Sequence, residues 1–383
     1  MTPLEAVTAA DPYPYYARLV AEGGLYRDEP LKLWVASSAR FVEEVFRNPD
    51  FEVRPKAERI PAALLGLRSG AVFGSLMRMT DGPKRCPLKS SAVSAINEAS
   101  AQACGRLAAF CANGLKVYSD SSSPLDVVRR FMFQLPTYAV GSCLGASADE
   151  LGTMTVEVST FVAGISPIAS PEQRILGDCA AESLSKRLAT LMTSKTNTGL
   201  LLRNFVTACA ERSIEPDIIV RNLLGLLFQT YDATAGLIGN SLRVLAPSKL
   251  LQRRLLTDDG SLRSFVWEVL RFDSPVQNTR RFAAKTVLLG DAVVRAGDQM
   301  LLVLAAANRD PSRFPMPERF DIDRSGHRGF GFGVGTHQCP GEPLALEITC
   351  AALRILLTSS FPFGAFPESV TYRASANTRI PLF

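Results

Sequence analysis

The spacing of apolar residues predicts a chain that is mostly helical. The longer segments with helical spacing are residues 92–114, 125–145, 148–165 and 171–193. Because apolar positions three and four residues apart share one face, we expect a series of amphipathic helices there. Shorter helices are expected at residues 11–20, 38–47 and 264–272.

One segment stands out because it is long, apolar and almost uncharged. Residues 217–246 are bounded by Pro216 and Pro247 and contain few charged side chains. A helix of this length would extend for about 45 Å, enough to cross a domain. We therefore expect a central, buried helix.

Short aliphatic and β-branched runs predict a smaller β region. These runs are residues 31–36, 286–289, 292–294 and 299–304. Residues 361–383 contain Pro362, Gly364 and Pro367 ahead of Thr371, which predicts a terminal hairpin. The fold class expected is α+β, mainly α with a smaller β region.

Two stretches lack periodicity and predict loops. Residues 53–79 mix prolines and glycines with apolar side chains, including Phe73 and Met77. Residues 164–171 form a second break, which contains Pro167 and Pro171. Clusters of glycine, proline and serine between periodic segments indicate connections.

Composition favours one globular domain over residues 1–383. The chain is 47% hydrophobic, and no serine-rich or glycine-rich linker divides it. Its formal charge of +5 comes without a basic run, which argues against a nucleic-acid partner. No apolar run reaches eighteen residues and the start lacks a signal-peptide pattern, so we expect a soluble, cytoplasmic protein without membrane contact.

Cysteine usage points to one position. The eight cysteines form no CxxC pair, which argues against a zinc site and a disulfide framework. Cys339, however, follows glycines 333 and 335 and precedes an apolar helical segment that begins near Pro343. A helix N-terminus stabilises a thiolate, the form of cysteine that ligates metal. The alternative is a glycine-rich turn with a buried cysteine.

The loop resembles the haem-binding signature of the cytochrome P450 family. The residues that match are Phe332, Gly333, Gly335, His337, Cys339, Gly341 and, further on, Ala345. The resemblance implies a haem b cofactor whose iron takes Cys339 as axial ligand. It implies that Phe332 packs near the sulfur, that His337 binds a propionate, and that haem lies between the long distal helix and this loop.

The same resemblance assigns further cations to the haem propionates. Residues 81–89 match the family's Asp-x-Pro-x-His-x-x-Leu-Arg pattern, with Arg85 and Lys89 at its two cationic positions. Arg281 matches a third propionate-binding position. The alternative for Arg85 and Lys89 is a pair of ordinary surface cations.

The long helix departs from the family pattern Ala-Gly-x-Asp/Glu-Thr. Gln229 and Thr230 replace the small pair, Asp232 keeps the acid, and Ala233 stands at the alcohol position beside haem. Thr234 is one residue late, about 100° around the helix. Gln229, Thr230, Asp232 and Thr234 are the candidate catalytic residues. Alternatively, Gln229 and Thr230 satisfy helix carbonyls.

Two further groups follow from the resemblance. Glu268, Arg271 and Arg319 match the family's buried network that supports the cysteine loop. The expected substrate pocket is lined by Phe73, Met77, Gln229, Gln277 and Asn278.

The expected function is a haem-thiolate monooxygenase that oxidises a small or mid-sized organic molecule, of secondary-metabolite or terpenoid type. Electrons would come from a ferredoxin-type partner through a basic face with Arg324, Arg328, Lys84 and Lys89. The altered helix keeps oxidation without oxygen insertion, or a peroxide-driven cycle, open. A haem sensor without turnover and a zinc protein using His327, His337 and Cys339 are alternatives of other classes.

Overall fold

The computed structural model describes the chain except residues 56, 83–84, 118–122, 197–198, 327 and 360. Lys84 and His327, both named in the sequence predictions, therefore lie outside the described residues. The chain divides into two compact units. Unit 1 comprises Met1–Pro55, Ala235–Cys339 and Leu356–Phe383, and unit 2 comprises Lys56–Thr234 and Pro340–Ile355. A single domain over 1–383 stays a prediction.

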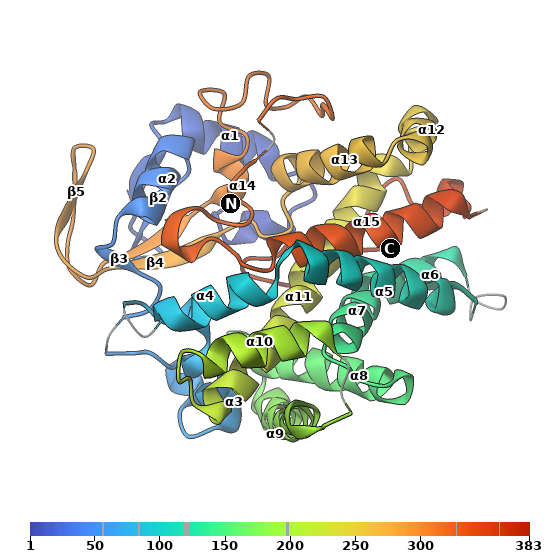
Figure 1. Ribbon diagram of the computed structural model, residues 1–383. Coiled ribbons are helices and arrows are strands. Elements are labelled where there is room, and N and C mark those ends of the chain that lie inside the picture. The colour runs from blue at the N-terminus through green and yellow to red at the C-terminus, as the bar shows by residue number, and fades with distance from the viewer. Residues whose placement is uncertain (56, 83–84, 118–122, 197–198, 327, 360) are drawn as a thin grey trace. The chain divides into compact units, whose positions relative to one another are not determined.

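Unit 1 contains a five-stranded sheet with the order β1-β2-β7-β4-β3. Figure 1 labels three of its strands, β2, β3 and β4. The strands are β1 (Leu25–Asp28), β2 (Leu33–Ala36), β7 (Gln299–Leu302), β4 (Thr279–Ala283) and β3 (Phe51–Glu52). β2 and β7 run parallel, and the other neighbours are antiparallel. The sheet joins residues near the beginning of the chain to residues far along it, since Trp34 pairs with Met300.

Apolar side chains cover both faces of this sheet, because successive residues of β7 point to opposite sides. Met300 and Leu302 belong to one core cluster with α2 (Ala39–Arg47), whereas Leu301 belongs to another with α1 (Tyr13–Ala21). Ser38 caps α2 by accepting a hydrogen bond from the Phe41 amide. The predicted helices at 11–20 and 38–47 are confirmed.

The rest of unit 1 comprises short helices and two hairpins. They are η1 (Glu5–Thr8), α12 (Lys249–Thr257), α13 (Asp259–Phe272), α14 (Leu304–Ala307), η4 (Gly335–His337), η5 (Phe363–Ala365), β5 (Val287–Leu289) with β6 (Ala292–Val294), and β8 (Thr371–Tyr372) with β9 (Pro381–Leu382). The terminal hairpin is confirmed. β1 and α12 were not predicted.

Unit 2 is helical. Its elements are η2 (Ala62–Leu64), α3 (Arg68–Ser75), η3 (Met77–Met79), α4 (Arg85–Ala95), α5 (Glu98–Val117), α6 (Pro124–Phe133), α7 (Leu135–Cys143), α8 (Ala148–Gly164), α9 (Pro171–Thr193) and α10 (Leu200–Ala210). α11 (Pro216–Leu245) and α15 (Glu342–Thr358) each contribute residues to both units. Within the described part of the chain, no helix combines the length and apolar character needed to cross a membrane.

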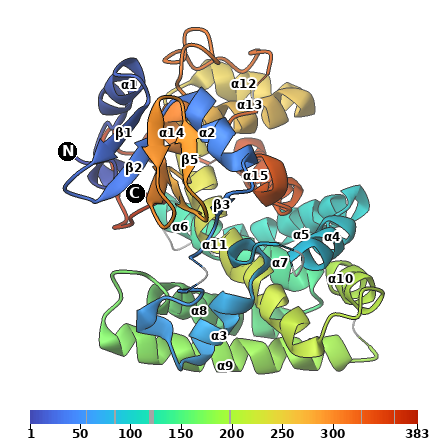
Figure 2. The ribbon, with the colours of Figure 1, turned by 90° about the vertical axis from the view of Figure 1, so that its left-hand side faces the viewer.

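α8 and α9 pack closely side by side (Figure 2). A Cβ atom on Gly164 would lie 2.7 Å from the Gly177 Cα, so the approach requires glycine. Ser170 begins α9 with a capping box that includes Gln173. The predicted helix at 171–193 and the break before it are confirmed.

Three sequence predictions need correction. Residues 92–114 are not one helix, because the chain breaks at Asn97, whose side chain accepts a hydrogen bond from the Ser100 amide. Residues 125–145 are divided into α6 and α7, with Pro136 in the first turn of α7. Residues 53–79 are more than a loop, since they include α3 and a buried Met77.

Candidate functional site

A tight loop in unit 1 presents Cys339 to solvent. Gly333 and Gly335 have φ angles of +67° and +70°, which glycine adopts without a Cβ penalty. The Cys339 amide donates to the Phe332 carbonyl at 2.8 Å and closes the loop. The side chain of Cys339 is consequently exposed at the end of a constrained backbone.

The loop lies against the C-terminal end of α2. A Cβ atom on Gly335 would be 3.2 Å from the Phe46 carbonyl oxygen, tighter than an ordinary contact. Gly335 therefore serves two requirements at once, a left-handed backbone and a close approach.

Gly335→Ala is expected to lower the free energy of unfolding by about 1–2 kcal/mol through the left-handed strain alone, with a further loss from the Phe46 contact. Gly297→Ala is the matched control, because Gly297 has φ +88° and open space around its Cβ position. Chemical unfolding of both variants separates the cost of the left-handed backbone, which both share, from the cost of the Phe46 contact, which only Gly335→Ala has. Equal losses in the two variants would show that the Phe46 contact is unimportant.

Side chains from α13 and from the segment after α14 hold the loop. The Phe332 ring packs edge-on against Trp267, with centroids 5.9 Å apart. The Phe330 amide donates to the Asn308 side-chain oxygen at 2.6 Å. Asn308 also donates to the Ser274 hydroxyl at 2.6 Å, which connects the loop to the end of α13.

A buried ion pair lies behind these contacts. Arg271 donates to both oxygens of Glu268 at 2.9 and 2.7 Å, and neither side chain is exposed. Burial raises the pKa of Glu268, but the hydrogen bond and charge of Arg271, with help from Arg324, hold that pKa below its usual value. The carboxylate stays ionised and anchors the network.

The third guanidinium of this network is not the predicted one. Arg319 has an exposed side chain and contributes its carbonyl, which accepts from Arg271 at 3.1 Å. Arg324 Nε instead lies 3.4 Å from Glu268 Oε1, with only 9% of its side chain exposed. This position also removes Arg324 from the predicted basic docking face.

Two of the residues predicted to bind the propionates, Arg281 and His337, lie in the same unit as the thiol. Arg281 on β4 is only 6% exposed, and its guanidinium carbon lies 4.9 Å from the centroid of the Phe46 ring. His337 is half-buried in η4. An accessible thiol, cations for carboxylates and a glycine backbone without side-chain bulk form a donor set that fits haem.

The remaining predicted haem contacts belong to unit 2. Lys89 on α4 is half-buried, Ala233 is half-buried on α11, and Gly341 lies in the turn before α15. Arg85 is in the first turn of α4, and its side chain is outside the described part.

On α11, Gln229 and Thr230 bind the carbonyls of their own helix. The Gln229 side-chain nitrogen donates to the Gly225 carbonyl at 2.8 Å, and the Thr230 hydroxyl donates to the Leu226 carbonyl at 2.7 Å. A Cβ atom on Gly225 would lie 3.0 Å from that nitrogen. The alternative role, satisfaction of helix carbonyls, is the one these side chains have here.

Thr234 differs from Thr230, one turn earlier. It is 1% exposed, and its hydroxyl has no hydrogen-bond partner among the described residues. Asp232 is half-buried. This part of α11 packs against α6 within unit 2, since the rings of Tyr231 and Phe133 have centroids 5.8 Å apart.

Two predicted pocket residues have structural roles instead. The Gln277 oxygen accepts from the Tyr16 hydroxyl at 2.9 Å, and its nitrogen donates to the Ser274 carbonyl at 2.6 Å. Asn278 donates to the Ala376 carbonyl at 2.9 Å. Because both are buried and bonded inside unit 1, the prediction that they contact substrate is corrected.

Phe73 and Met77 remain pocket predictions. Phe73 is half-buried on α3. Met77 is buried, and its amide donates to the Asn222 side-chain oxygen on α11 at 2.9 Å.

Sequence reasoning missed Asn308, Trp267 and Arg324. Asn308 binds the Phe330 amide and the Ser274 hydroxyl, and Arg324 pairs with Glu268, all far apart in the sequence, so these contacts leave no pattern in it. Trp267 did carry a signal, because it is one of only two tryptophans and directly precedes Glu268.

Known proteins match this chain along most of its length. The family model for cytochrome P450 matches residues 220–362. Putative cytochrome P450 133B2 of Xylella fastidiosa is 30% identical over 290 residues, covering 74% of this chain and 72% of the relative. Cytochrome P450 monooxygenase PikC of Streptomyces venezuelae is 29% identical over 363 residues, covering 91% and 84%.

The solved structure of CalO2 has the same fold. It matches with a TM-score of 0.86 at 22% identity, over 100% of this chain and 96% of the other. The residues that match the family model include the Cys339 loop, and the relatives are cytochromes P450. The protein is therefore a haem-iron oxidoreductase of monooxygenase type. The chain belongs to the cytochrome P450 family.

Proposed function

We propose that this protein uses haem b, dioxygen and electrons from a ferredoxin-type partner to oxidise a small or mid-sized organic molecule of secondary-metabolite or terpenoid type. The observation that carries the proposal is the Cys339 loop, whose two left-handed glycines and closing hydrogen bond present the thiol. When bound, thiolate-ligated haem supplies iron chemistry that favours O–O cleavage.

The chain's own residues hold and orient this cofactor. Cys339 provides the ligand, while Phe332 shields the sulfur by packing on Trp267. His337, Arg281, Arg85 and Lys89 neutralise the propionates. Gly333, Gly341 and Ala233 leave room for the ring, because larger side chains at these places would occupy space beside it.

Proton delivery is assigned to Asp232, with Thr234 as second candidate. Asp232 keeps the acidic position of the family pattern, and Ala233 removes the neighbouring alcohol. Residues two apart on a helix do not face each other, so Asp232 and Thr234 cannot exchange a proton directly. A water or a substrate hydroxyl would complete the route. Gln229 and Thr230 shape the helix surface beside it.

Asp232→Asn is expected to lower turnover about 100-fold, the usual size of an acid–base contribution. Thr234→Val tests the second candidate, and Thr230→Val is its matched control because the Thr230 hydroxyl already binds Leu226. The measurements are the rate of product formation, which gives the turnover, and the product formed per electron consumed. A larger loss for Thr234→Val than for Asp232→Asn would move the proton route to Thr234.

Arg328 is proposed to contact an acidic electron donor. Its side chain is exposed, and its guanidinium carbon lies 5.8 Å from the centroid of the Trp267 ring. Lys89 stays a candidate for the same role in unit 2.

Arg328→Glu is expected to slow reduction by a ferredoxin about tenfold at low ionic strength, because charge complementarity steers association. Arg253→Glu, an exposed position on α12, is the control for net charge. The reduction rates are measured by stopped flow. The difference in rate between the two variants should disappear as the salt concentration rises, because salt screens the charges. Equal rates for both variants at low salt would exclude Arg328 from the docking surface.

One experiment tests the function as a whole. Holoenzyme is screened for compounds that shift its haem spin state, and hits are incubated with NAD(P)H, ferredoxin, reductase and ¹⁸O₂. Product carrying one ¹⁸O atom supports monooxygenation. Unlabelled oxidised product indicates desaturation, coupling or ring formation, and turnover with peroxide alone indicates a peroxide-driven cycle. Ligand binding without product indicates a sensor.

A further inference from the structure

Arg309 in unit 1 is a cation with no acidic partner of its own. Its guanidinium is held between two aromatic rings, with its central carbon 3.8 Å from the Tyr13 centroid and 3.7 Å from the Phe272 centroid. Nε and Nη2 both donate to the Phe272 carbonyl, at 3.0 and 2.7 Å. No carboxylate among the described residues comes within ion-pair distance of it.

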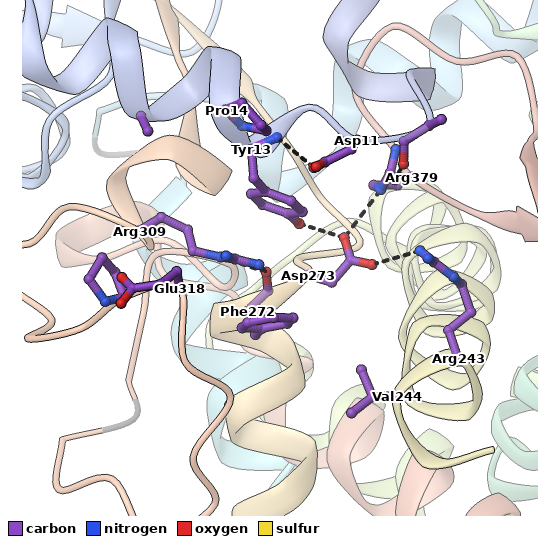
Figure 3. Close-up of a pocket in the computed structure, with 13 residues that line it drawn as sticks. Asp11, Tyr13, Pro14, Arg243, Val244, Phe272, Asp273, Arg309, Glu318 and Arg379 are labelled. Carbon is purple, nitrogen blue, oxygen red and sulfur yellow. Dashed lines mark hydrogen bonds and ion pairs between the residues drawn. The ribbon is translucent and has the colours of Figure 1, made fainter. Parts of the chain in front are cut away.

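The neighbouring acid is already satisfied by other groups. Asp273 accepts from the Tyr13 hydroxyl at 2.5 Å and from Arg379 at 3.2 Å, and it pairs with Arg243 at 3.4 Å (Figure 3). Two arginines and one tyrosine thus contact this buried carboxylate. Arg309 is the arginine of this group that takes no part in the pairing, and burial lowers its pKa.

Arg309 opens into a cavity of about 830 Å³ that lies entirely within unit 1. Apolar groups form much of its wall, among them Pro14, Ala17, Val244 and Pro317. Three acids line it together with the three arginines. Asp273 is paired with Arg243 and Arg379, whereas Asp11 and Glu318 are exposed, so solvent and salt weaken their field. Asp11 is further engaged as acceptor from the Tyr13 amide at 3.1 Å.

The stacked geometry determines what Arg309 can still bind. Both faces of the guanidinium are covered by rings, and one edge is occupied by the Phe272 carbonyl. Among the described residues no acceptor binds Nη1, so the edge that carries it is the one left for a ligand. A planar fork of donors fixed by stacking is suited to an oxyanion, since little conformational entropy is lost on binding.

We propose that this cavity binds an organic carboxylate, with its oxygens on the open edge of Arg309 and its apolar body along Ala17, Val244 and Pro317. The apolar wall favours a carboxylate with a hydrocarbon body over inorganic phosphate, because burial of that body adds to the charge interaction. The site is separate from the cysteine loop and does not depend on the proposed function.

The test uses hexanoate as probe and isothermal titration of the holoenzyme. Arg309→Gln is expected to weaken binding about tenfold or more, the usual worth of a charge-assisted hydrogen bond. Arg253→Gln, on the exposed face of α12, should leave it unchanged. Hexan-1-ol and inorganic phosphate should both bind more weakly than hexanoate.

Because Arg309→Gln also removes two structural hydrogen bonds, a second pair of variants keeps the test decisive. Ala17 is an exposed helical residue on the cavity wall, so Ala17→Glu and Ala17→Gln should both fold. The two side chains are nearly equal in size, and the added negative charge should weaken hexanoate binding roughly fivefold relative to Ala17→Gln. Identical affinities for these two variants, or hexan-1-ol binding as tightly as hexanoate, would overturn the proposal.

Discussion

Replacing Cys339 with serine is expected to abolish turnover and to remove the long-wavelength absorption band of the reduced, carbon monoxide-bound protein. Serine has nearly the same shape as cysteine, so the loop closed by the Phe332 carbonyl should persist. Its hydroxyl does not ionise near neutral pH and cannot replace a thiolate as ligand. Activity and spectrum should therefore be lost without loss of the fold.

Cys179→Ser is the matched control for this prediction. Cys179 is exposed on α9, far along the sequence from the loop, so its substitution tests the effect of losing an accessible thiol. Spectra of the reduced carbon monoxide complex are recorded for both variants at equal haem content. A Cys339→Ser protein that keeps the long-wavelength band would remove the basis of the proposed function.

Glu268→Gln is expected to reduce the free energy of unfolding by about 3–5 kcal/mol, because it leaves a buried guanidinium without its counter-ion. Arg271 is fully buried and donates to both Glu268 oxygens. Glutamine can accept only one of these bonds and carries no charge. The expected result is a large fall in the urea midpoint and weaker haem retention.

Arg324→Gln is the control within the same network. Arg324 Nε lies 3.4 Å from Glu268, but Arg271 still neutralises the carboxylate when Arg324 is lost. We expect a smaller decrease in stability. Equal effects from the two substitutions would mean that the Glu268–Arg271 pair is not the dominant contact.

The same pair predicts a pH dependence. The folded pKa of Glu268 is below the usual value of 4.5, so its stabilisation is fully present above that value. It is lost as the pH falls from 4.5 through the folded pKa. Unfolding of the wild-type protein should become easier over that range, whereas Glu268→Gln should lack this component.

Local chemistry explains why part of the site could be predicted. The Cys339 loop is contiguous, and its glycines occur where the backbone is left-handed or closely packed. α11 was also expected within one residue at each end, because a long uncharged segment between two prolines has few alternatives. The alternative roles of Gln229 and Thr230 follow from the tendency of such side chains to bind nearby carbonyls.

Other features depend on segments that meet only after folding. The sequence predicts Gln277 as a pocket residue, but its side-chain oxygen accepts a hydrogen bond from the Tyr16 hydroxyl, 261 positions away. Arg324 takes the place expected for Arg319, because its guanidinium lies beside Glu268 whereas Arg319 contributes only its carbonyl. Neither choice leaves a periodic or compositional signal.

The sequence by itself determined the family, the helical class and the long helix α11, and it carries the prediction of the thiol ligand, because these follow from contiguous motifs and from hydrophobic spacing. Only the tertiary structure decided which polar side chains form hydrogen bonds inside the protein and which arginine pairs with Glu268. It also decided that Arg309 lies against two aromatic rings and lines a cavity. The physical reason is that burial and hydrogen-bond pairing are properties of neighbours in space.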